Sequence, residues 1–234
     1  MAGIAGWRHG LLVVASLACF ATAGMTTRRL EALAPAATAD RELMYFPSGK
    51  LLDVLCFGNA TLAADLVWLR GLQYYGHHRL TDGRFDHIGH IFDVATSLDP
   101  HFTNAYVFGG LVLAAEGRDV EGGIRFMRRG LAENPDSYEL AFEIGFLYHV
   151  GLRDFGHAAY FYRRALRHPD CPEHVRRFAA YACEKIALND EAVELWQEIL
   201  RTSTQPAMRR LAEERIAMIE GVLDRGGDAR EEAD

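Results

Sequence analysis

The chain has 234 residues and a formal net charge of −7; 50% of its residues are hydrophobic and 24% are charged. This globular composition excludes a chain that is disordered throughout, and the acidic balance without a basic stripe argues against a nucleic-acid partner. The four cysteines contain no CxxC pair, which excludes a zinc ribbon, a thioredoxin-type site and a disulfide framework.

The N-terminal 25 residues have the pattern of a targeting segment. The uncharged stretch Gly10–Met25 is shorter than the about 20 apolar residues of a membrane-spanning helix. It includes Ala21–Ala23, a small-x-small pattern typical of signal-peptide cleavage. Trp7 and the basic Arg28 suit an uncleaved anchor instead, whereas a lipoprotein signal at Cys19 fits poorly because apolar residues continue beyond it. We expect a location at the cell envelope, either anchored in the inner membrane or periplasmic and exported.

A linker over residues 26–46 and a helical lead-in over residues 47–68 are expected to follow. Ser48 can cap a short helix over Lys50–Phe57, and Gly58 can end it. Beyond this point, three leucines and a glutamine recur with helical spacing. This spacing predicts one buried stripe with a polar end, formed by Leu62, Leu66, Leu69 and Gln73.

The body of the chain repeats itself with a period of 34 or 35 residues. Prolines end three successive segments of helical period, and glycines recur upstream of them. A large residue and a small residue also recur within each unit, and such a pair allows two helices to cross closely, which predicts a helix–turn–helix unit. The recurring sets are Pro100, Pro135 and Pro169; Gly76, Gly110 and Gly145; Phe92, Met127 and Tyr162; and Ala95, Gly130 and Ala165.

Residues 69–169 resemble three tetratricopeptide repeats, with the best agreement at Gly145–Tyr148, Ala158, Tyr162, Ala165 and Pro169. The resemblance implies an all-α solenoid of helix–turn–helix hairpins. The repeats are expected at about 69–100, 103–135 and 138–169, followed by a degenerate unit at 173–204 and a capping helix at 206–223. The last residues, 224–234, are expected to be a disordered acidic tail. The leucine-rich lead-in is similar to that of exported or membrane-tethered bacterial repeat proteins.

In tetratricopeptide repeats the first helices line a concave groove that binds peptides, so the resemblance implies a binding groove here. The matching positions are Arg70, Gln73 and His77 in the first repeat, Asn104, Val107 and Leu111 in the second, and Glu139, Phe142, Phe146 and His149 in the third. This groove is apolar in its middle, which favours an extended or helical apolar segment of a partner. The alternative is that its apolar members only pack between neighbouring repeats.

Catalytic and metal-binding patterns are weak. Four histidines that could bind zinc or copper lie close together, namely His77, His78, His87 and His90. Nothing in the sequence makes them converge, so we expect core-edge or surface side chains, with no metal and no other cofactor. The sequence has no GxSxG, Walker, HExxH or GxGxxG motif. We therefore expect neither an enzyme nor a small-molecule substrate.

These patterns together predict a non-catalytic, protein-binding adaptor at the cell envelope. It would support the assembly of a membrane, secretion, pilus or respiratory complex, with protein partners and with membrane contact through its N-terminal segment. Two alternatives remain open. The first is an assembly chaperone that presents apoprotein clients, such as an apocytochrome, for cofactor insertion. The second is a histidine-rich metal-binding module.

Overall fold

The computed structural model describes residues 58–231 and, nearer the N-terminus, the helical residues Ser16, Ala18, Ala21, Thr22, Gly24–Thr26 and Arg29. The chain divides into two compact units, Met1–Phe46 and Pro47–Asp234. Most of the predicted signal or anchor segment, the linker and the short helix over residues 50–57 lie outside the described residues. Among the residues that are described, no helix has both the length and the apolarity to cross a membrane.

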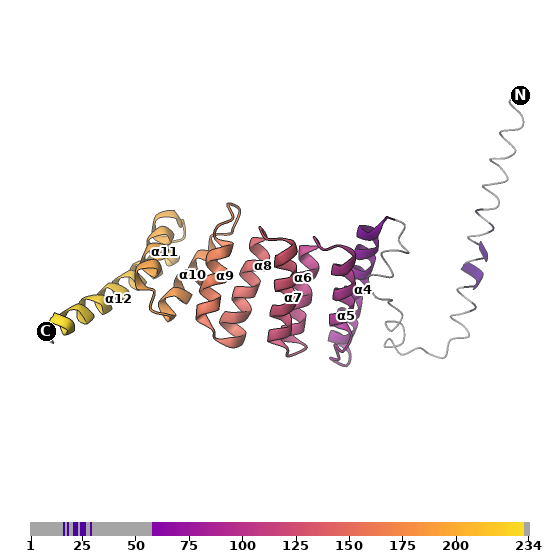
Figure 1. Cartoon of the computed structure of the whole chain (residues 1–234), viewed down its shortest axis with the longest axis horizontal. Coiled ribbons are helices and arrows are strands. Elements are labelled where there is room, and N and C mark those ends of the chain that lie inside the picture. Colours follow the sequence, from indigo (N-terminus) through magenta and orange to yellow (C-terminus); the bar gives the residue numbers. More distant parts are fainter. Residues whose placement is uncertain are drawn as a thin grey trace, which may run out of the picture. The chain divides into compact units, whose positions relative to one another are not determined.

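The described part of the second unit consists of stacked helices (Figure 1). They are α4 (Ala60–Leu80), α5 (Ile88–Leu98), α6 (Thr103–Ala115), α7 (Val120–Glu133), α8 (Tyr138–Phe146) with the π-helix η1 (Leu147–Leu152), α9 (Phe155–Ala165), α10 (His174–Lys185), α11 (Asn189–Thr202) and α12 (Pro206–Glu231). Consecutive helices pair as the hairpins α4–α5, α6–α7, α8–α9 and α10–α11, each hairpin packs against the next, and α12 packs against α11. This arrangement is an all-α solenoid and fits a tetratricopeptide-like fold.

Three of these helices begin at a side-chain cap, which fixes where their hairpins turn. In each case a side-chain oxygen accepts a hydrogen bond from a backbone N–H in the first turn, a group that has no partner within the helix. The caps are Asp119 on Gly122 in α7, Ser137 on Leu140 in α8 and Asp154 on His157 in α9.

The first and last helices differ in extent from those expected. Helix α4 begins at Ala60, so residues 60–68 belong to the first hairpin and not to a separate lead-in. Gly58 has a φ of 85°, which places the turn directly before this helix. Helix α12 continues to Glu231, past Leu223, where the sequence predicts its end. The added residues include two arginines, an alanine and a glutamate, which favour a helix, and two glycines and two aspartates, which do not.

The buried stripe predicted for α4 is wrong. Leu62, Leu66 and Leu69 are 60%, 61% and 52% exposed. Helix α4 stands at one end of the helical stack (Figure 1), and it buries a different face, formed by Ala64, Val67, Gly71, Tyr74 and His78. Periodicity misled here because α4 is apolar on two sides, and its spacing alone does not say which side is covered.

The recurring upstream glycines meet recurring large residues where the helices of the second and third hairpins cross. A Cβ atom added to Gly110 would lie 2.5 Å from Cγ of Met127, and one added to Gly145 would lie 2.8 Å from Cδ1 of Tyr162. Such distances are shorter than real Cβ contacts, so these helices cross too closely for any larger residue.

The first hairpin uses a different glycine from the one that the period indicates. A Cβ atom added to Gly71 would lie 3.1 Å from Cε1 of Phe92, whereas one added to Gly76 would have no neighbour within 4 Å. The hairpin therefore keeps the same kind of crossing, five residues earlier in its first helix than predicted.

Trp196 joins the last hairpin to α12. Its side chain is 2% exposed, and its indole N–H donates to the Glu184 carboxylate on α10. The same carboxylate accepts from Arg215 on α12, at 2.6 Å between Nη2 and Oε2. This hydrogen-bonded group connects α10, α11 and α12 around one buried ring.

Candidate protein-binding face

The predicted groove residues all remain accessible, because each of the ten is exposed or half-buried. They lie on the first helices of the first three hairpins, α4, α6 and α8, with His149 in η1. Whether they bind a partner stays a prediction.

The third and fourth hairpins share a half-buried aromatic surface, which we call the aromatic face. It consists of Phe142, Phe146, His149, Phe178 and Tyr181. The ring centroids of Phe142 and Phe178 are 5.5 Å apart, and those of Phe146 and Phe178 are 6.2 Å apart. The His149 ring stacks on Tyr181 at 5.4 Å. The aromatic rings therefore form one continuous surface from α8 to α10, held at the separations that aromatic pairs prefer.

The phenylalanine rings of this face pack between neighbouring repeats and are still partly accessible to a partner. Phe142 and Phe146 contact Phe178 of the next hairpin, as the packing alternative predicts. Both phenylalanines nevertheless remain partly exposed. Aromatic rings that are fixed by their neighbours and still partly accessible lose little entropy on binding, which suits the centre of an interface.

Two members of the aromatic face, Phe178 and Tyr181, were not among the predicted site residues. Phe178 follows Phe142 by 36 residues and lies at a similar place in the fourth hairpin. The period could have located it, but the fourth unit resembles the repeat family too weakly for its groove positions to be assigned.

Cations flank the rings of Phe178 and Tyr181. The Cζ atom of Arg177 lies 5.3 Å from the ring centroid of Phe178, and the Nζ atom of Lys185 lies 5.1 Å from that of Tyr181.

Glu143 is a third residue that the sequence did not indicate. It lies beside Phe142 on α8 and is half-buried. Within the part of the chain that the structure describes, its carboxylate makes no hydrogen bond and no ion pair. Burial raises the pKa of this carboxyl above its ordinary value of 4.5 because the charged form loses hydration. Helix α8 therefore carries, one residue after Phe142, an acid whose charge no side chain of the described residues balances.

His149 and Tyr162 form a polar contact behind the rings. The Nδ1 atom of His149 lies 3.1 Å from the Tyr162 hydroxyl oxygen. Burial lowers the pKa of His149 and raises that of Tyr162, so both groups are neutral near pH 7. A neutral imidazole can accept a hydrogen bond from the hydroxyl, and this contact fixes the His149 ring against Tyr181.

We expect the Glu143→Gln variant to be more stable than the native chain at pH 7, by up to about 1 kcal/mol, because the amide has no charge to dehydrate. The raised pKa of Glu143 in the folded state means that the folded chain binds more protons than the unfolded chain above pH 4.5. The native chain therefore loses stability as the pH rises through this folded-state pKa. Urea unfolding of both chains at pH 4 and at pH 7 measures the effect. If Glu143→Gln is more stable than the native chain by the same amount at both pH values, the expected pH dependence is wrong.

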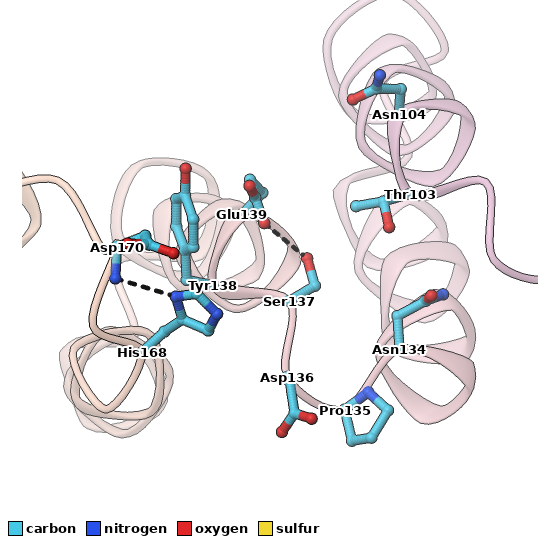
Figure 2. Close-up of a pocket in the computed structure, with 10 residues that line it drawn as sticks. All are labelled: Thr103, Asn104, Asn134, Pro135, Asp136, Ser137, Tyr138, Glu139, His168 and Asp170. Atoms are coloured by element: carbon cyan, nitrogen blue, oxygen red, sulfur yellow. Dashed lines mark hydrogen bonds between the residues drawn. The ribbon is translucent and has the colours of Figure 1, made fainter.

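A polar recess of about 640 Å³ lies at the ends of the hairpins (Figure 2). It is lined by Thr103, Asn104, Asn134, Pro135, Asp136, Ser137, Tyr138, Glu139, His168 and Asp170. Ser137 donates to Glu139 at 3.0 Å, and the backbone N–H of Asp170 donates to His168 at 3.2 Å. Asn104 and Glu139, two of the predicted groove residues, thus line one recess.

The four candidate histidines do not converge. His78 is buried, with Nδ1 2.6 Å from the Asp82 carboxylate and its ring 4.2 Å from that of Tyr74. His77 and His90 are exposed and His87 is half-buried. Over the described residues, no group of three or more histidine, cysteine, aspartate or glutamate side chains is placed to hold a metal ion.

Comparison with known proteins gives no family assignment. No family model matches the sequence, and no curated protein matches it. Among solved structures, the crystal structure of MamA is similar over 70% of this chain and 85% of the MamA chain, with 15% identity and a TM-score of 0.47. The function of the chain is therefore inferred from its own residues.

Proposed function

We propose that this chain is an adaptor that binds an apolar segment of a partner protein on the aromatic face. The observations that carry the proposal are the fixed, partly exposed rings and Glu143, the next residue after Phe142, whose half-buried carboxylate has no hydrogen bond or ion pair within the described residues. Rings suit apolar side chains of a partner, and the half-buried carboxylate of Glu143 suits a lysine or arginine of that partner. The bound segment is thus apolar with one basic residue.

The place of action that we propose is the cell envelope, where the adaptor would hold partners during the assembly of a membrane complex. The support is the apolar N-terminal segment Gly10–Met25 and its charged flanks, which suit export or anchoring. A solenoid suits such a role, because its extended faces can hold a partner without a closed pocket.

Crosslinked capture from the native membranes tests the binding role. We expect the tagged chain to enrich one set of membrane proteins, and the Phe142→Glu/Phe146→Glu variant to lose it without a change in helical content by circular dichroism. The matched control is Tyr160→Ala, which removes a 53% exposed aromatic residue from α9, outside the aromatic face. Capture that survives in the glutamate variant would contradict the proposal. A spread of unfolded or cofactor-free clients would favour an assembly chaperone.

A further inference from the structure

The exposed leucines of α4 follow the spacing of a coiled-coil seam. Starting at Leu62 and stepping alternately by four and three residues along the helix, each position reached is exposed or half-buried. In heptad terms they alternate between d and a positions. They are Leu62, Leu66, Leu69, Gln73, Gly76 and Leu80, and we call them the α4 seam. Leu80 at its end is 87% exposed.

The α4 seam points away from the rest of its hairpin. The f positions of the same heptads, which lie opposite an a/d seam, are Ala64, Gly71 and His78, and all three are buried. Gly71 is the glycine that meets Ile91 and Phe92 of α5. Helix α4 therefore packs into the stack with its f side and presents the leucines on its other side.

The charges beside the seam identify the partner that fits. Asp65 holds a g position and Arg70 the e position five residues later. In a parallel pair of helices, a g residue of one chain faces the e residue of the following heptad in the other. Asp65 of each copy would then face Arg70 of the other, so the helix is complementary to itself. The single polar a residue, Gln73, fixes the register of such a pair, as polar residues at a positions do.

We propose that two copies of this chain associate through a parallel pairing of their α4 helices along the α4 seam. The contact is isologous: each copy contributes the same leucines and the same two charged residues, Asp65 and Arg70, which form two ion pairs between the copies. It uses residues outside the aromatic face, so it does not depend on the proposed adaptor function. Gly76 contributes no side chain to the seam.

Reversing the charges of Asp65 and Arg70, and then combining the two reversed variants, tests the pairing on the full chain. Two differently tagged copies of the native chain, co-expressed and purified in mild detergent, are expected to co-purify. Asp65→Arg co-expressed with itself, or Arg70→Asp with itself, is expected to co-purify at least about tenfold less, because like charges then face each other. Asp65→Arg co-expressed with Arg70→Asp restores both ion pairs, so co-purification should recover.

The same charge changes on a different helix serve as controls, and three results would overturn the proposal. Glu121→Arg and Arg125→Asp make the same charge changes at exposed positions of α7 and are expected to leave co-purification unchanged. Failure of the native copies to co-purify would overturn the proposal. Association that the single reversals leave intact, or that mixing does not restore, would also overturn it. Such a result would show that a different helix, the membrane or another segment of the same chain covers the seam.

Discussion

Replacement of Trp196 by alanine is expected to lower the free energy of unfolding by about 3–5 kcal/mol, the largest loss that we predict for a single substitution. The side chain is 2% exposed and donates to Glu184, which in turn binds Arg215 of α12. Alanine removes the ring that these three helices surround and leaves a cavity. Urea unfolding followed by far-ultraviolet circular dichroism measures the loss.

Trp196→Phe is the control for this prediction. It keeps an aromatic ring but removes the indole N–H and the five-membered ring of the indole, so a smaller loss of about 1–2 kcal/mol is expected. Because hairpins of a solenoid are stabilised mainly by their neighbours, the alanine variant should unfold first in α10–α12. Amide hydrogen exchange locates the opening, and equal loss of protection along all hairpins would contradict a local role.

The second large effect is expected on binding. Glu143→Lys should weaken the affinity for the partner segment by about 100-fold, because it places a cation where the partner's own basic residue is expected. The matched control is Glu133→Lys, which makes the same charge change at an exposed residue at the end of α7, outside the aromatic face and the predicted groove. This control should cost about threefold or less, since exposed charges are screened. Calorimetric titration with the captured partner segment measures both affinities.

Exchange of the partner's basic residue for glutamate completes this test. The exchanged segment should bind Glu143→Lys better than it binds the native chain, because the pair is restored with its charges reversed. If both segments bind the variant equally, Glu143 does not pair with a partner cation.

The class of fold could be predicted from the sequence because close helix crossings require small residues. The recurring Gly110 and Gly145, set against Met127 and Tyr162, mark the crossings directly. The buried side of α4 could not be predicted in this way. Within the described residues, this helix is covered on one side only, and its leucines satisfy the helical period whether or not a neighbour is present.

The candidate site could be predicted only in part. Phe142 and Phe146 match the groove positions of the repeat family, so the resemblance indicates them. Phe178 lies in the unit that resembles the family least. Glu143 has no sequence signal at all, because an acid on a helix usually lies in solvent, and only the burial of its carboxyl distinguishes it.

Site-specific photocrosslinking in the native membranes tests most directly whether the aromatic face binds a partner. A benzophenone amino acid would replace Phe178 on α10 or, as the outward control, Tyr160 on α9. We predict a discrete crosslinked product of one partner from position 178, lost on the further substitution Glu143→Lys, and no such product from position 160. The same product from both positions, or none from position 178, would contradict binding at the aromatic face.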